Sequence, residues 1–145
     1  MKLFLDTSVL LAACGSEKGA SREVFRLAPL NDWTLITTPY VLEETERNLP
    51  KLTAAADSAW KTLQPELLIC DDVLTLNQLA VFPVAKDRPV LFSALAWAEV
   101  LLTLDRNDFT TLLGNEFYGL PVLKPGTFLE RQRSAGVLLL NQIAK

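Results

Sequence analysis

Short apolar runs alternate along this chain with longer segments in which apolar residues recur at helical spacing. The short runs, which favour β-structure, predict five strands, at residues 3–5, 33–37, 67–70, 100–104 and 120–123. The segments between them predict helices at residues 7–14, 21–27, 39–49, 53–63, 90–98, 107–113 and 125–133. Residues 73–81 fit either a crossover helix or an edge strand. This alternation favours a parallel sheet with helices on both faces.

Acidic residues lie where the predicted strands end. Asp6 follows the first strand, Asp105 follows the fourth, and Asp87 precedes the helix that leads into the fourth. Crossovers between parallel strands bring their carboxyl ends to one edge, where α/β proteins place their chemistry. Each acid taken alone also fits a helix N-cap or a charge that complements a helix dipole. The functional interpretation therefore depends on the acids coming together.

The helix predicted at 39–49 offers two adjacent acids, and helical periodicity separates them. Its inner stripe consists of Val41, Leu42, Thr45, Leu49 and Leu52. At about 100° per residue, Glu43 falls nearly opposite this stripe, where it can pair with Arg47 on the surface. Glu44 falls on the border of the stripe, from which a side chain can reach a cleft. We therefore expect Glu44 in the site and Glu43 on the surface.

Composition limits the chemistry that is available. The 145 residues, half of them apolar, predict one domain over 1–145 with an apolar tail at 134–145. The chain has no His, which excludes a Ser-His-Asp triad, a Cys-His pair and a His-based zinc site. Its two Cys, Cys14 and Cys70, are too few for a structural zinc site and indicate a reducing compartment. Any metal must be held by oxygen ligands, which suits Mg²⁺ or Mn²⁺.

Charge and hydropathy limit the partners. The net charge of −3 gives no general attraction to nucleic acid or to an anionic membrane. The N-terminal apolar stretch imitates a lipoprotein signal peptide, but Asp6 interrupts it. No other run is long enough to span a bilayer. We expect a cytoplasmic protein with no membrane partner.

Converging carboxylates require a cation. Asp6, Glu44, Asp87 and Asp105 could not all ionise together without compensation, which a divalent metal supplies. Such a metal can bind a scissile phosphate, activate a water and stabilise the leaving oxygen. Thr7, Ser8 and Thr103 could support this site through their hydroxyls. Asp108 fits either an additional ligand or a helix N-cap. The pattern predicts phosphodiester hydrolysis by metal-activated water.

These motifs together resemble those of the PIN-domain nucleases. Leu3 to Ser8 is similar to the first acidic motif of the family, an apolar strand that ends in Asp before hydroxyl residues. Thr38 to Glu44 resembles the second, in which the acid comes six positions after a hydroxyl residue. The third and fourth are similar to Lys86 to Leu91 and to Leu102 to Phe109. The resemblance covers nearly the whole chain.

The resemblance implies a three-layer α/β/α fold with a five-stranded parallel sheet of strand order 3-2-1-4-5. In that order the first and fourth strands are neighbours, which puts Asp6 beside Asp105. It further implies Mg²⁺ or Mn²⁺, a single-stranded RNA substrate and a homodimer. Many small members are toxins that an antitoxin protein blocks. Our expectation is an endoribonuclease of this kind, with an antitoxin as a candidate partner.

Two other functions fit parts of this pattern. An aspartyl phosphotransferase of the haloacid-dehalogenase type also begins with an apolar strand and Asp, but it needs a second Asp where this chain has Ser8. A catalytically idle PIN-fold module could bind nucleic acid or a partner protein. An idle site, however, has no reason to keep four mutually repelling acids.

Overall fold

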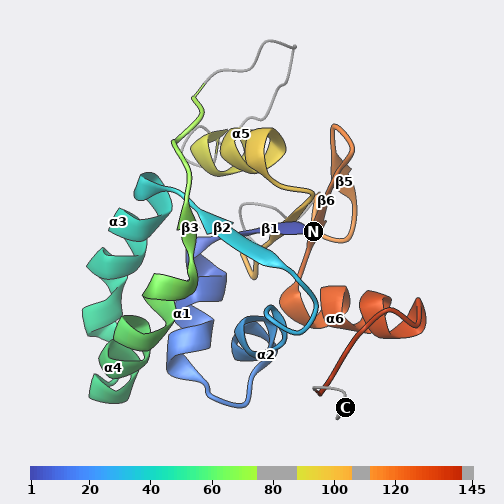
Figure 1. The fold of residues 1–145 in the computed structure, drawn as a ribbon. Helices are drawn as coiled ribbons and strands as arrows, with labels where there is room; N and C mark the ends of the chain where they lie inside the picture. The colour runs from blue at the N-terminus through green and yellow to red at the C-terminus, as the bar shows by residue number, and fades with distance from the viewer. Residues whose placement is uncertain (75–87, 106–111, 142–145) are drawn as a thin grey trace.

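The computed structural model describes residues 1–74, 88–105 and 112–141 (Figure 1). Asp87, Asp108 and most of the helix predicted at 107–113 lie outside these described residues. Most of the undecided segment 73–81 lies outside them as well.

The central sheet is parallel except at one edge. Its strands are β1 (Lys2–Leu5), β2 (Thr34–Thr37), β3 (Leu68–Ile69), β4 (Val100–Leu102), β5 (Glu116–Phe117) and β6 (Leu120–Leu123). Within the described residues the strand order is β3-β2-β1-β4-β6-β5, and every pair except β5–β6 is parallel. Since β6 is the fifth predicted strand, the parallel part confirms the predicted order 3-2-1-4-5.

The additional edge strand corrects the predicted strand count. β5 pairs with β6 in an antiparallel hairpin, with Phe117 opposite Leu120. The two turn residues between them, Tyr118 and Gly119, both have positive φ, at 49° and 84°. Two-residue hairpin turns with positive φ at both positions match the twist of the flanking strands. The sequence signal was weak because β5 has two residues and the first turn position holds Tyr instead of Asn or Asp.

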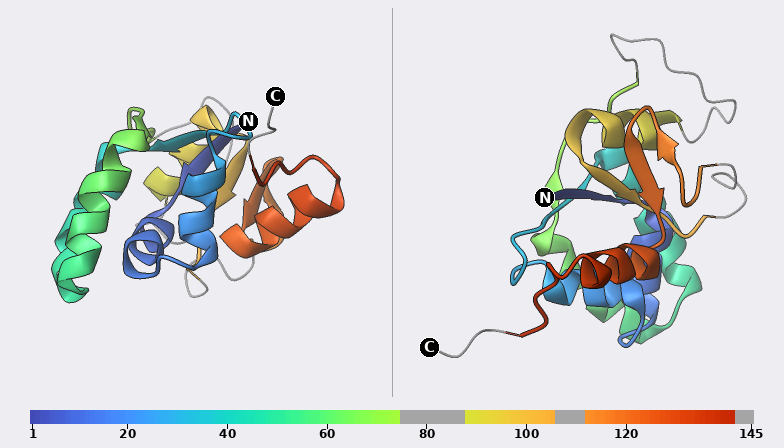
Figure 2. Two further views of the ribbon diagram at one scale, coloured as in Figure 1. Left: turned by 60° about the horizontal axis from the view of Figure 1, so that its bottom comes forward. Right: turned by 90° about the vertical axis from the view of Figure 1, so that its right-hand side faces the viewer.

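Helices cover both faces of the sheet, as predicted (Figure 1). One face carries α5 (Arg88–Trp97), and the other carries α1 (Thr7–Gly15), α2 (Ala20–Leu27) and α6 (Pro125–Ser134). Figure 2, in its right-hand view, shows the sheet between α5 and the layer that contains α2 and α6. The helices α3 (Pro39–Asn48) and α4 (Ala54–Leu63) contact α1 beside the β3 edge. Short 3₁₀ turns at Leu49–Lys51 and Gln64–Glu66 follow α3 and α4.

The core is built around the central strand β1. Leu3, Phe4 and Leu5 have no exposed surface, because β1 lies between β2 and β4 with helices on both faces. Strands buried on both faces read as continuous apolar runs, which explains the Leu-Phe-Leu pattern. Both cysteines are free thiols, with Cys14 buried and Cys70 half-buried. The described helices include none that is long and apolar enough to cross a membrane.

The C-terminal tail is attached through one side chain. The Asn31 amide nitrogen donates to the carbonyl of Leu139 at 2.9 Å, and the Leu139 N–H donates to the Asn31 amide oxygen at 2.8 Å. Leu138 packs against the core, while Val137 and Leu140 are exposed. The described part of the tail therefore lies against the loop that precedes β2.

Candidate active site

Asp6 is placed at the carboxyl end of β1, between the strands where the sheet order reverses. Its N–H donates to the carbonyl of Leu102 at 3.1 Å, which ties it to the end of β4. Its own carbonyl accepts from Val9 and Leu10 at the start of α1. Asp6 occupies the N-cap position of α1, yet its side chain makes no capping hydrogen bond. Helix capping therefore does not explain this carboxylate, which is only 6% exposed.

Two hydroxyls hold the Asp6 carboxylate from both sides of the β1–β4 junction. Thr103 Oγ1 donates to Asp6 Oδ2 at 2.8 Å, and Ser8 Oγ donates to the same oxygen at 3.2 Å. The two hydroxyl oxygens lie 3.3 Å apart. Ser8 and Thr103 were predicted as supporting residues; both hydrogen-bond Asp6, and their support of a metal site stays a prediction. The orientation of the carboxylate is thus fixed by the first turn of α1 and by the residue that follows β4.

The same hydroxyls organise the chain after β4. The Leu104 N–H donates to Ser8 Oγ at 2.9 Å, and the Asp105 N–H donates to Thr103 Oγ1 at 3.1 Å. β4 therefore ends at Leu102, two residues before the predicted end, because side chains replace a neighbouring strand as hydrogen-bond partners. Asp105 is joined to Asp6 through Thr103, since both bond the Thr103 hydroxyl.

Thr7 has a different partner from Ser8. Its hydroxyl donates to the carbonyl of Val41 in α3 at 3.4 Å and is buried. The Thr45 hydroxyl donates to the same carbonyl at 2.8 Å. Thr7 was predicted to bond a carboxylate or a phosphate. Its hydroxyl instead bonds the Val41 carbonyl and so links α1 to α3. This link positions the helix that carries Glu44.

The electrostatic environment of Asp6 opposes its ionisation. Burial is the main cause that raises the pKa of Asp6 from its usual 3.8 to about 6. Hydrogen bonds from Thr103, the Thr7 backbone and Ser8 lower that pKa, while the negative charge of Glu44 raises it further. The charge of Glu44, on α3, therefore acts on Asp6, which follows β1. Within the described residues no salt bridge neutralises either of them.

Glu43 and Glu44 of α3 differ as helical periodicity predicted. Glu43 is exposed and pairs with Arg47 at 3.1 Å, which confirms its assignment to the surface. Glu44 is half-buried, and its charge acts on Asp6. A metal-binding role for Glu44 stays a prediction.

The predicted acids are brought together only in part within the described chain. Asp6, Glu44 and Asp105 lie at one edge of the sheet, while Asp87 and Asp108 fall outside the described residues. Residues 1–74, 88–105 and 112–141 contain no group of three or more His, Cys, Asp or Glu able to hold a metal. The four-carboxylate centre, with Asp108 as an additional ligand, therefore stays a prediction.

Asp72 contributes to this edge and was not predicted. Its Oδ2 accepts a hydrogen bond from the Tyr40 N–H at 3.0 Å, in the first turn of α3. The sequence did contain a signal, because Asp71 and Asp72 directly follow the predicted third strand. Asp72 fixes the start of the helix that carries Glu44. Two polar atoms here, Asp72 Oδ1 and Thr38 Oγ1, are buried without a partner among the described residues.

The donor set fits a hard divalent cation. The site offers carboxylate and hydroxyl oxygens, which Mg²⁺ and Mn²⁺ prefer. A buried carboxylate next to a second carboxylate, with no basic partner among the described residues, is unfavourable unless a cation joins it. The residues therefore suit the metal that the fold family implies.

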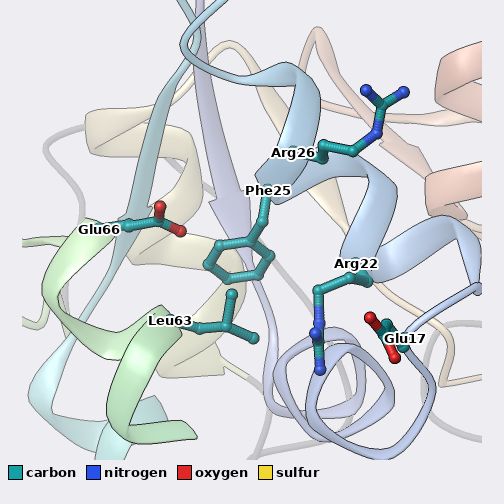
Figure 3. A pocket seen from close by; sticks show the side chains of 6 residues that line it. All are labelled: Glu17, Arg22, Phe25, Arg26, Leu63 and Glu66. Atoms are coloured by element: carbon teal, nitrogen blue, oxygen red, sulfur yellow. The ribbon is translucent and has the colours of Figure 1, made fainter. Parts of the chain in front are cut away.

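A separate cavity lies away from Asp6, near the opposite end of α1 (Figure 3). It has a volume of about 310 Å³ and is lined by Glu17, Arg22, Phe25, Arg26, Leu63 and Glu66. Phe25 and Leu63 face each other across it, and Arg22 and Glu17 lie side by side at one side. This mixed lining offers no acidic cluster, so the cavity is not part of the candidate active site.

The fold and the site define a doubly wound α/β protein with an acidic centre where the strand order reverses. The chain belongs to the PIN domain family, whose model matches residues 2–112. Proteins of this family are generally nucleases that use a divalent metal. The family resemblance of the sequence motifs is thereby confirmed.

Among solved structures, the fold is similar to a chain of VapBC2 from Rickettsia felis, described as bound to a DNA fragment from their promoter. The two chains share 18% identity over 84% of this chain and 97% of that chain, with a TM-score of 0.60. Among curated proteins none matches.

Proposed function

We propose that this protein is a Mg²⁺- or Mn²⁺-dependent endoribonuclease that hydrolyses phosphodiester bonds of single-stranded RNA. Asp6, Glu44, Asp87 and Asp105 would hold the metal, with Asp108 as an additional ligand. The observation that carries the proposal is the buried Asp6 carboxylate, whose pKa the charge of Glu44 raises and which has hydroxyl and backbone donors but no basic partner in the described chain. Membership of the PIN domain family supports it.

The residues of this chain prepare the site in two ways. Thr103 and Ser8 fix the direction of the Asp6 carboxylate, so that little reorganisation is needed when a ligand binds. With a pKa of about 6, Asp6 is mostly ionised at neutral pH and can accept a cation. A bound divalent ion would supply charge neutralisation at the phosphate and a lowered pKa for the attacking water.

We propose two protein partners on the same basis. The sequence motifs resemble those of toxins that an antitoxin blocks, and the fold likeness to a chain of VapBC2 supports this comparison. The proposed antitoxin is a separate protein, and the proposed assembly of this chain is a homodimer. Co-expression with a small protein encoded next to it, followed by size-exclusion chromatography, tests both.

Cleavage of a labelled single-stranded RNA pool tests the enzymatic proposal. We would compare wild type, Asp6→Asn and Asp57→Asn, each with Mn²⁺, Mg²⁺ or EDTA. Asp57 is an exposed residue of α4 that pairs with Lys61, so Asp57→Asn makes the same chemical change away from the site. We expect wild type and Asp57→Asn to cleave with metal only, and Asp6→Asn to lose activity.

Each alternative result has a defined meaning. Equal cleavage by all three proteins would exclude Asp6 from the reaction and indicate a contaminating nuclease. Binding of RNA without cleavage by any protein would favour the idle PIN-fold binding module. This module has one observation in its favour, since the described residues do not by themselves gather three metal ligands.

A further inference from the structure

An open pocket lies beside the acidic edge of the sheet, and none of the candidate active-site residues lines it. It has a volume of about 240 Å³ and is lined by Leu113, Gly114, Lys124 and Thr127. Lys124 directly follows β6, and Thr127 lies in the first turn of α6. Figure 2, in its right-hand view, shows β6 leading straight into α6.

The sheet register places Lys124 beside Thr103, the residue that hydrogen-bonds the Asp6 carboxylate. β4 and β6 pair with Leu102 opposite Leu123, so the following residues, Thr103 and Lys124, are opposite each other. The Thr103 N–H donates to the Leu123 carbonyl at 3.0 Å, which extends this pairing by one residue. Lys124 keeps extended backbone angles, φ −72° and ψ 150°. Neighbouring strands lie about 4.8 Å apart, so the Lys124 backbone is one strand spacing from the residue that touches Asp6.

Lys124 brings a positive charge that nothing in the described chain neutralises. Within residues 1–74, 88–105 and 112–141 no salt bridge involves Lys124, although the side chain is only half-exposed. The Thr127 hydroxyl forms no hydrogen bond to another residue in those same ranges. An ammonium and a hydroxyl that line one pocket, both without a partner in the described ranges, form a suitable environment for a tetrahedral oxyanion.

The negative net charge of the protein means that a nucleic acid needs local positive charges such as the Lys124 ammonium. A net charge of −3 provides no general attraction for a polyanion, and the acidic centre repels one. A nucleic-acid backbone that reaches the acidic centre therefore needs local cations next to it. Lys124 follows the end of β6, which β4 separates from β1 and Asp6.

We propose that Lys124 and Thr127 form a phosphate-binding subsite that holds an RNA backbone phosphate adjacent to the one cleaved. This inference rests on the proposed function, because the phosphate at the subsite belongs to the same RNA that is cleaved at the acidic centre. Lys124 is a positioning residue and does not touch the reacting atoms. The subsite contributes to the affinity for RNA. It also determines which phosphate of the RNA lies at Asp6.

The test measures RNA affinity independently of cleavage. Variants are made in an Asp6→Asn background, and binding to a labelled single-stranded RNA is followed by fluorescence anisotropy with Mn²⁺ over a range of salt concentrations. Lys124→Gln removes the charge and Lys124→Arg keeps it. Lys18→Gln is the matched control, since Lys18 is an exposed lysine in the loop after α1. Thermal unfolding of each variant confirms that it is folded.

We expect Lys124→Gln to weaken binding by about threefold to tenfold at low salt. The slope of log affinity against log salt should fall by about 0.7, the value for one phosphate contact on a single strand. Lys124→Arg and Lys18→Gln should bind as the background protein does. In the wild-type background, Lys124→Gln should raise KM and leave kcat within about twofold.

Three results would overturn the subsite. RNA binding that is unchanged by Lys124→Gln would remove the subsite and leave the proposed nuclease intact. Equal losses of RNA affinity in Lys124→Gln and Lys18→Gln would show that any removed positive charge weakens binding, whatever its position. Absence of RNA binding and cleavage in every protein, wild type included, would refute the subsite and the proposed function together.

Discussion

Replacing Asp6 by Asn should stabilise the metal-free protein at neutral pH. In the folded protein the Asp6 carboxyl is buried beside Glu44, and its pKa rises from 3.8 to about 6. Asn keeps the size of the side chain and an oxygen that can accept from Thr103 and Ser8, but it carries no charge. The substitution therefore removes the unfavourable burial of a negative charge.

The magnitude follows from the two pKa values. A rise from 3.8 to about 6 corresponds to about 3 kcal/mol, at about 1.4 kcal/mol for each pKa unit. Below pH 3.8 the carboxyl is protonated in both the folded and the unfolded protein, and the charge has no effect on stability. Between 3.8 and 6 the unfolded chain ionises first, so the stability of wild type falls as pH rises. The advantage of Asp6→Asn should grow from about 1 kcal/mol at pH 4.5 to about 3 kcal/mol at pH 7.5.

Urea unfolding in EDTA, followed by tryptophan fluorescence at several pH values, measures this difference. The matched control is Asp57→Asn, which should change the free energy of unfolding by less than about 0.5 kcal/mol at every pH. Added Mn²⁺ should stabilise wild type and act much less on Asp6→Asn, because a ligand that binds only the folded state stabilises it. If the stability advantage of Asp6→Asn does not grow with pH, the conclusion that burial and the Glu44 charge raise the pKa of Asp6 is refuted.

Other substitutions at this edge have distinct expected outcomes. Glu44→Gln should lower the pKa of Asp6, measured by NMR titration of its carboxyl, and should reduce RNA cleavage by at least about tenfold. Glu43→Gln, one residue away, should change neither quantity and cost only a few tenths of a kcal/mol in chemical denaturation. Thr103→Val should weaken Mn²⁺ binding by about tenfold to a hundredfold in calorimetric titrations, and unchanged affinity would exclude a positioning role. Asp72→Ala should destabilise the fold by about 1 kcal/mol in urea unfolding, because α3 loses its N-terminal hydrogen bond.

Regular local patterns predicted much of the fold. The fully buried β1 reads as a short continuous apolar run, and its parallel neighbours follow from the alternation of strands and helices. The separation of Glu43 from Glu44 needed only the helical period, because the α3 surface is regular over its whole length. Asp6 was found by the position of an acid after a strand, a rule that applies equally to Asp72 and was not extended to it.

Long-range contacts explain what local patterns missed. β4 ends at Leu102 because the Leu104 N–H donates to Ser8, which is 96 positions away in the sequence. No sequence pattern near Leu104 indicates that partner. Thr7 and Ser8 look equivalent in sequence, yet one faces α3 and the other faces β4. The hairpin strand β5 has only two residues, too few to show the alternation of apolar and polar positions that predicts a strand.

The hydrogen bond between Thr103 and Asp6 also sets when during synthesis the site can exist. It joins residues 97 positions apart, with Thr103 in the last third of a chain of 145 residues. Contacts of such sequence separation form only after the intervening chain is available and ordered. A nascent or prematurely terminated chain that lacks β4 therefore carries Asp6 and Glu44 without the partner that orients the carboxylate. The chain must therefore be synthesised past Thr103 before the oriented Asp6 carboxylate can form.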